Sequence, residues 1–177
     1  ITLEGIDHLE LADCEYARRM RCEIKLIANL RLFEQGNQVY VLPLMIKKDE
    51  ILAKISGSNN AVTLSGKFSE DITLIGKGAG SLPTASAIVS DLNKVLRHPE
   101  PFPPPPITSE LVLESMGNIR FRHTLRFEVR DHTGIFGHIG SIFERHSINI
   151  YALEQLPQYH RIGAEGDEIV IFTLTIQ

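Results

Sequence analysis

The residues that could do chemistry in this chain gather in two glycine turns, each followed by a helical pattern. In the first turn, a β-branched run leads into GKGAGS and then into a helix. Glycines after a strand let the backbone approach a ligand closely, and the N–H groups of a helix N-terminus attract anions. One edge of a cofactor or phosphate site is therefore predicted at Gly78, Ala79, Gly80 and Thr84. A turn with only a folding role is the alternative.

The second turn consists of Asp131, His132, Thr133 and Gly134. A helical apolar pattern follows it, so the backbone at Gly134 could admit a small carboxylate to the helix N-terminus. These four residues are therefore candidates for binding a small carboxylate ligand. The alternative is a purely structural turn in which Asp131 or Thr133 caps the helix.

Other kinds of site have little support in the sequence. Cys14 and Cys22 are the only cysteines, and no Cys/His group has metal-ligand spacing, so we predict neither a metal site nor a disulfide framework. The seven histidines are scattered. His132 and His138 flank the second turn, and at six residues apart we expect them to point to different faces of a helix.

Composition narrows the function classes further. The chain has 177 residues, 43% hydrophobic and 23% charged, as in an ordinary globular protein. A formal net charge of −4, with no basic stripe, argues against nucleic-acid binding. No apolar run approaches the roughly 18 to 20 residues of a membrane span, and no leader is apparent, so a cytoplasmic location is expected.

The first half of the chain is predicted to position the first glycine turn. We expect a strand at residues 1–6, a helix at 10–21, and a hairpin of strands 23–33 and 38–46. Pro43 cannot donate to a ladder, so the strand 38–46 should be an edge strand or be bulged at this residue. One or two helical turns at 47–54 and strands 60–68 and 72–75 follow, and the strands are expected to form a mixed or mostly antiparallel sheet.

The helix after the glycines is predicted from Ser81 to about Leu96, with Pro83 near its first turn. The sequence HPEPFPPPP at residues 98–106 cannot continue a helix and is expected to be an extended linker, with a recognition peptide for a proline-binding partner as the alternative. Beyond the linker, a strand near 125–130, a helix from Ile135, and strands 148–155 and 168–176 give the order strand, helix, strand, strand.

Several quoted stretches resemble known families. GKGAGSLPTASAIVSDL, together with EGI, YARRMRCEIKLIA and NNAV, resembles the homoserine dehydrogenases, and RFEVRDHTGIFGHIGSIFERHSINI resembles an ACT regulatory domain. The resemblance implies an α+β fold: a mixed sheet with helices, then a ferredoxin-like ACT domain that is incomplete because a second helix and a fourth strand are missing. The domains implied are a partial substrate-binding and dimerisation domain at 1–97, a linker at 98–119 and a partial ACT domain at 120–177.

The resemblance also implies a function. The family interconverts L-homoserine and L-aspartate 4-semialdehyde with NAD or NADP, in threonine and methionine biosynthesis. Gly80 and Thr84 match family positions beside the cofactor, whereas the catalytic lysine would precede Ile1, so no catalytic residue is assigned. We expect a homodimer, an effector such as threonine at the ACT unit, and no activity or tight NAD(P) binding in this chain alone. A stand-alone amino-acid-binding module without catalysis is the alternative.

Overall fold

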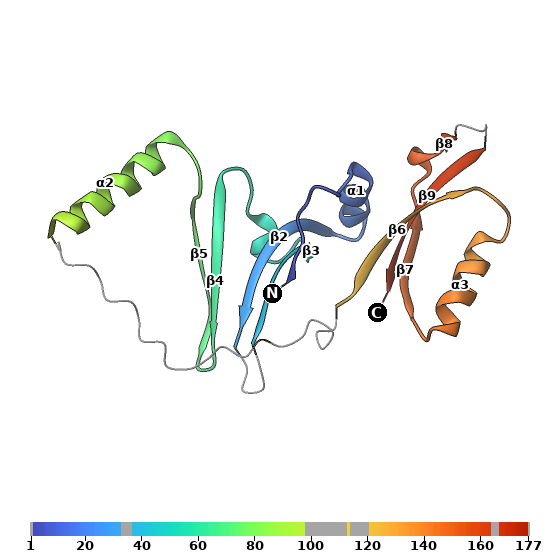
Figure 1. The fold of residues 1–177 in the computed structure, drawn as a ribbon, viewed down its shortest axis with the longest axis horizontal. Helices are drawn as coiled ribbons and strands as arrows, with labels where there is room; N and C mark the ends of the chain where they lie inside the picture. Colours follow the sequence, from blue (N-terminus) through green and yellow to red (C-terminus); the bar gives the residue numbers. More distant parts are fainter. Residues whose placement is uncertain (1, 33–36, 98–112, 114–120, 164–166, 177) are drawn as a thin grey trace. The chain divides into compact units, whose positions relative to one another are not determined.

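The computed structural model describes residues 2–32, 37–97, 113, 121–163 and 167–176. The chain forms two compact units, one made of Ile1–Lys47 and Leu111–Gln177 and the other of Lys48–Glu110. Figure 1 gives the order of the elements along the chain. The proline-rich linker and nearly all of residues 98–119 lie outside the described residues, so the predicted domain boundaries stay predictions.

The first unit begins with a three-stranded sheet and one helix. Its elements are β1 (Thr2–Leu3), α1 (Leu11–Arg19), β2 (Cys22–Arg31) and β3 (Gln38–Lys47), in the sheet order β1-β3-β2. β2 and β3 pair antiparallel in continuous register from Cys22↔Lys47 to Arg31↔Gln38, which confirms the predicted hairpin. Residues 33–36 of its turn lie outside the described residues.

Pro43 lies in β3, the middle strand of this sheet, and yet it sits at a local edge. β1 is short and pairs only with Tyr40 and Val41. The Glu4 N–H donates to the Val41 carbonyl at 2.9 Å, so Val41 faces β1, and by alternation Pro43 faces the same side. The prediction of an edge or bulged strand was therefore wrong, because β3 is the middle strand and its register with β2 is continuous. Proline is tolerated at this position because β1 has no residue paired there, so the missing N–H of Pro43 breaks no ladder bond.

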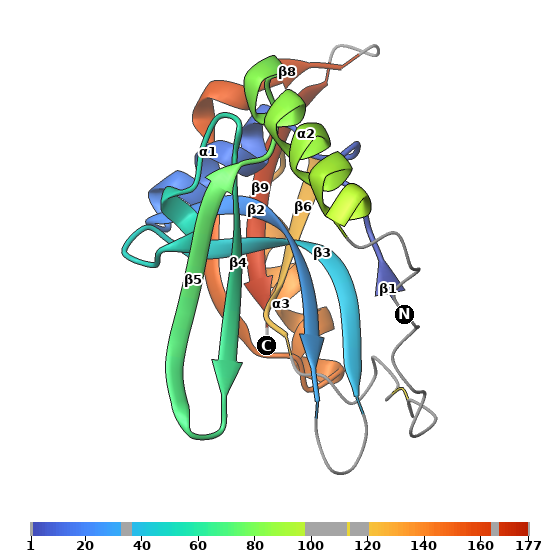
Figure 2. The same ribbon diagram turned by 90° about the vertical axis from the view of Figure 1, so that its left-hand side faces the viewer.

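The second unit contains a hairpin and a long helix. Its elements are η1 (Leu52–Lys54), β4 (Asn59–Gly66), β5 (Ser69–Lys77) and α2 (Ser81–Arg97). β4 and β5 form their own antiparallel two-stranded sheet, which Figure 2 shows as a long ribbon. The expectation of one sheet for all these strands was therefore wrong, because alternation and length predict a strand but do not identify its neighbour.

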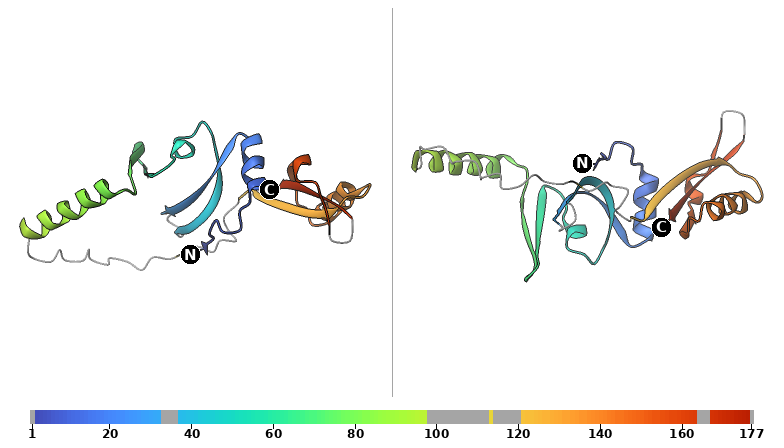
Figure 3. Two further views of the ribbon diagram at one scale, coloured as in Figure 1. Left: turned by 90° about the horizontal axis from the view of Figure 1, so that it is seen from above. Right: turned by 60° about the horizontal axis from the view of Figure 1, so that its bottom comes forward.

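The C-terminal part of the first unit contains the predicted strand, helix, strand and strand, and in addition the two-residue strand β8, which was not predicted. It contains β6 (His123–Arg130), α3 (Ile135–Arg145), β7 (Ile150–Gln155), η3 (Pro157–Tyr159), β8 (Arg161–Ile162) and β9 (Glu168–Ile176). We call β6, β9 and β7, with β8 at the end of β9, the C-terminal sheet. α3 lies along one face, as Figure 3 shows, and Phe172 of β9 contacts Phe136 of α3 edge to face, with centroids 5.1 Å apart.

The opposite face of the C-terminal sheet is covered by α1, which the sequence analysis did not anticipate. Tyr16 is fully buried there, and its hydroxyl lies 2.8 Å from the Thr175 hydroxyl of β9. Ala12 and Leu156 complete this small core. Because α1 and α3 lie on opposite faces, β9 is buried on both sides from Val170 to Thr175. On the α3 side, Leu153 of β7 stays partly exposed.

Candidate functional site

The first glycine turn joins β5 to α2, as predicted. Lys77 is the last residue of β5, and Ser81 is the first of α2. The Gly78 N–H donates to the Ser58 carbonyl at 2.7 Å, and the Lys77 ammonium lies 3.2 Å from the Ser58 hydroxyl. The turn is therefore fixed to the chain segment just before β4.

The surroundings and backbone of the turn favour glycine at Gly78 and Gly80. A Cβ at Gly78 would lie 2.1 Å from the side-chain nitrogen of Asn60, so even an alanine would force that amide to move. Gly80 has φ +124°, which side-chain-bearing residues rarely adopt, and Pro83 packs against it. These observations are consistent with a folding role for both glycines, and a binding role at this turn stays a prediction.

Thr84 is turned toward the same loop. Its hydroxyl donates to the Gly80 carbonyl at 2.8 Å, and its N–H donates to the same oxygen at 3.1 Å. The hydroxyl proton is used inside the turn, so only the oxygen lone pairs could face a ligand. The first N–H groups of α2 have no intrahelical partner by the geometry of any helix. The turn can thus offer a ligand the N–H donors of the α2 N-terminus and the Thr84 oxygen as one acceptor. These groups could form one side of a binding site.

The second turn has the geometry of an open helix N-terminus. Gly134 is the N-cap residue of α3, with φ +91°, and no side chain makes a capping hydrogen bond. The structural alternative named Asp131 or Thr133 as the cap, and that was wrong. The Asp131 N–H instead donates to the Glu168 carbonyl of β9 at 2.7 Å, which ties the turn to the sheet.

The two histidines beside this turn lie close together. The rings of His132 and His138 meet edge to face, with centroids 6.2 Å apart. The expectation that they point to different faces of a helix was wrong, because His132 precedes α3 and belongs to the turn, whereas His138 lies one turn into the helix.

The structure also brings together a group that sequence reasoning missed. Asp131, His160 and Glu168 each offer one side-chain atom that could ligate a metal ion, and these atoms lie within 4.8 Å of one another. All three residues are exposed. The His160 Nε2 atom is 3.6 Å from a Glu168 carboxylate oxygen. These residues come from separate segments, so no local spacing in the sequence could reveal them.

Among the described residues, none of the helices has the length and apolar character needed to span a membrane.

Comparisons with known proteins identify the family. A family model described as homoserine dehydrogenase matches residues 1–92. The chain belongs to the homoserine dehydrogenase family. A homoserine dehydrogenase of Neisseria gonorrhoeae is 32% identical, over 97% of this chain and 41% of the relative. The corresponding protein of Pseudomonas aeruginosa is also 32% identical, over 86% of this chain and 37% of the relative.

A solved structure shows the same fold over almost the whole chain. The crystal structure of a homoserine dehydrogenase from Thiobacillus denitrificans matches with a TM-score of 0.72 at 29% identity, covering 99% of this chain and 41% of that one. The match extends past residue 92, so the C-terminal sheet and α3 also have counterparts in this homoserine dehydrogenase. The chain spans about two fifths of the length of these relatives.

Proposed function

We propose that this chain is part of a homoserine dehydrogenase that interconverts L-homoserine and L-aspartate 4-semialdehyde with NAD or NADP, in the cytoplasmic synthesis of threonine and methionine. The observation that carries the proposal is the family match over residues 1–92, continued by a relative that aligns with 97% of the chain. This match favours a part of the enzyme over a stand-alone amino-acid-binding module.

The first glycine turn fits one edge of a nicotinamide cofactor site. A bound nicotinamide accepts or donates the hydride. Gly80 and the N-terminus of α2 would face the cofactor, and the Thr84 oxygen would accept a hydrogen bond, since its proton is held by the Gly80 carbonyl. Asn60 fills the space beside Gly78, so we assign Gly78 and Ala79 to shaping the turn next to the cofactor. The catalytic lysine is expected upstream of Ile1.

The test compares the chain with the longer protein that contains it. We expect the full-length protein to oxidise L-homoserine with NAD or NADP, and this chain alone to show neither turnover nor micromolar cofactor binding by calorimetry. Thr84→Val should raise the cofactor KM of the full-length enzyme, whereas Ser86→Ala, two residues further along the exposed α2, should not. A full-length protein without homoserine oxidation would refute the assignment.

A regulatory role is proposed for the C-terminal sheet with α3, as an ACT unit that binds a small amino acid at Asp131, His132, Thr133 and Gly134. The uncapped N-terminus of α3 and the left-handed Gly134 support it, because an α-carboxylate could accept the first-turn N–H groups. Millimolar L-threonine should raise the melting temperature of the full-length enzyme, and D-threonine is the matched control. Equal shifts with both enantiomers would contradict a specific site.

A homodimer is proposed from the apolar surface of the β4–β5 ribbon. Register places Val62 opposite Leu74 and Leu64 opposite Ile72, so these four residues share one face, and each is more than half exposed. A two-stranded ribbon with one bare apolar face is marginal alone and gains stability when another sheet or helix covers it. We assign a second copy of the chain as that cover.

A further inference from the structure

α1 crosses the C-terminal sheet and contacts each of its main strands through a different polar side chain. The side chains are Asp13, Tyr16 and Arg19, spaced by three residues, so they lie along one side of the helix. Their partners follow the order of the sheet: Asp13 to Arg126 of β6, Tyr16 to Thr175 of β9, and Arg19 to Glu154 of β7. We call these three contacts the α1 contact row.

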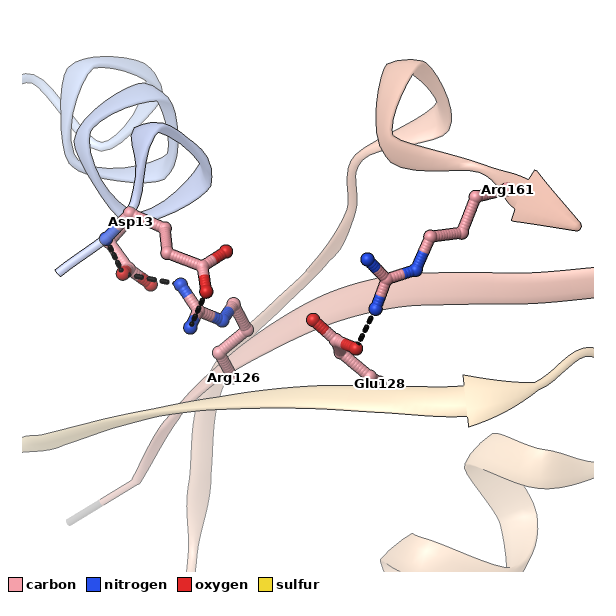
Figure 4. Close-up of polar contacts among 5 residues, drawn as sticks. Asp13, Arg126, Glu128 and Arg161 are labelled. Atoms are coloured by element: carbon pink, nitrogen blue, oxygen red, sulfur yellow. Dashed lines mark hydrogen bonds and ion pairs between the residues drawn. The ribbon is translucent and has the colours of Figure 1, made fainter. Parts of the chain in front are cut away.

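The contact at β6 is the most elaborate of the row. Arg126 reaches Asp13 at 2.6 Å through one guanidinium nitrogen and Glu10 at 3.1 Å through the other. The same Asp13 oxygen accepts the Glu10 N–H at 2.8 Å, so Arg126 holds the first turn of α1 (Figure 4). Arg126 and Asp13 are only 20% and 16% exposed, which limits screening by solvent and salt.

The other two contacts fix the rest of the helix. Tyr16 is fully buried between α1 and β9. Arg19 bonds to Glu154 at 2.6 Å and also approaches the side-chain oxygen of Gln158 at 3.4 Å. Gln158 in turn donates to Glu15 at 2.6 Å. Both ends and the middle of α1 are therefore attached to the C-terminal sheet.

One end of this connection leads to the proposed effector turn, and the other leads to the β1-β3-β2 sheet. β6 runs from Arg126 directly into the turn at Asp131, only one residue after the strand ends. On the other side, α1 ends at Arg19, and β2 begins at Cys22. The whole of α1 and of the β1-β3-β2 sheet lies within the residues that match the family, whereas the C-terminal sheet lies outside them.

We propose that the α1 contact row transmits effector binding at the Asp131–Gly134 turn to the β1-β3-β2 sheet of the family region. This inference rests on the proposed function, because it requires an effector at that turn. A ligand changes activity only if it favours one arrangement of the two regions, and a helix that contacts three strands couples their positions without touching either ligand. Arg126 is thus a positioning residue for regulation.

The test uses the full-length enzyme, with L-threonine as the probe. Arg126→Gln removes the contacts to Asp13 and Glu10. Arg161→Gln is the matched control, since Arg161 pairs with Glu128 within the C-terminal sheet and does not reach α1 (Figure 4). We expect Arg126→Gln to keep its uninhibited turnover and its threonine affinity by calorimetry while inhibition weakens about fivefold or more. Arg126→Lys should restore part of the inhibition, and Arg161→Gln should behave as wild type.

Two results would overturn the inference, and they differ. If threonine inhibits Arg126→Gln and wild type equally, coupling through α1 is refuted while the regulatory site stands. If threonine neither binds nor inhibits the wild type, the proposed regulatory site fails, and this inference fails with it. If Arg126→Gln does not fold, Tyr16→Phe replaces it, because this change removes only the bond to Thr175 at the centre of the α1 contact row. Its inhibition by threonine is then compared with that of the wild type.

Discussion

α1 and α2 show how little the apolar content of a helix says about its burial. α2 carries six apolar residues that are more than half exposed, and none of its residues is buried. α1 is shorter and more polar, yet it buries Ala12, Tyr16 and Ala17. The difference lies in the partner: α1 packs on the C-terminal sheet of its own unit, whereas the described residues of the second unit offer α2 no comparable surface. An exposed apolar helix or ribbon in this chain therefore marks an interface still to be filled.

The largest expected effect on stability comes from truncating a buried phenylalanine, and truncating an exposed phenylalanine provides the comparison. Phe172 is fully buried and stacks on Phe127, with centroids 5.1 Å apart, whereas Phe68 at the β4–β5 turn is 95% exposed. Phe172→Ala should cost about 3–5 kcal/mol of unfolding free energy in urea denaturation, because it leaves a cavity. Phe68→Ala should change it by less than about 0.5 kcal/mol. Similar losses would mean that Phe68 is also covered in solution.

The next effect tests the exposed face of the β4–β5 ribbon. Leu74→Glu places a charge where we propose a second copy to pack, and should raise the dimer dissociation constant of the full-length protein about 30-fold or more. Light scattering across a dilution series measures it. Ser65→Glu adds the same charge to the neighbouring strand, one residue beyond Leu64, and should leave the dimer intact. A dimer unaffected by Leu74→Glu would assign this face to another partner.

Tyr16 gives a smaller effect that depends on pH. Burial raises the pKa of the Tyr16 hydroxyl above its usual 10.0, and the bond to Thr175 opposes part of the rise. The raised pKa means that the unfolded chain loses this proton first. Its contribution to stability is thus complete below about pH 10 and declines as pH rises toward the folded-state pKa. Tyr16→Phe should cost about 1 kcal/mol at neutral pH.

Above pH 10 the stability of Tyr16→Phe should fall less steeply than that of the wild type, because the variant lacks the shifted group. Urea denaturation at several values between pH 8 and pH 11 measures both slopes. Parallel slopes would indicate that the hydroxyl is hydrated in solution and that α1 is less firmly seated than its burial implies.

The last comparison, which includes the smallest expected effect, at Thr173, separates two threonines under α1. Thr173 and Thr175 are both buried on β9, but only Thr175 has a hydrogen-bond partner among the described residues, and the Thr173 hydroxyl has none. Thr173→Val should therefore be neutral or stabilising by up to about 1 kcal/mol, whereas Thr175→Val should destabilise by about 1–2 kcal/mol, since it leaves the Tyr16 hydroxyl unpaired. Thermal melts compare them, and a destabilised Thr173→Val would imply a bound water.

Local pattern sufficed for most of the elements. Alternation along 125–130 and the apolar spacing after Ile135 predicted β6 and α3, and the two β-branched runs around residues 34–37 predicted the β2–β3 hairpin. These signals come from neighbours in the sequence, and each is a property of a single strand or helix. The two glycine turns were predicted for the same reason, and both lie where a strand leads into a helix.

The partners of these elements were not predictable in this way. Nothing in residues 10–21 indicates that α1 covers β9, because its contacts join residues more than a hundred positions apart, such as Asp13 and Arg126. For the same reason, the sequence did not predict the group of Asp131, His160 and Glu168. It also did not predict that His132 lies close to His138. A side chain's reach depends on which strands become neighbours, and local spacing carries no such information.

The sequence by itself determined the family, the order of the elements and the two glycine turns, since each depends on residue types at short range. The tertiary structure decided that β4–β5 is a separate ribbon, that Gly134 and not a side chain caps α3, and that α1 is held by all three main strands of the C-terminal sheet. These outcomes depend on pairing and burial between distant segments, such as the contact of Arg126 with Asp13. Such tertiary contacts override the intrinsic helix and strand propensities of single residues.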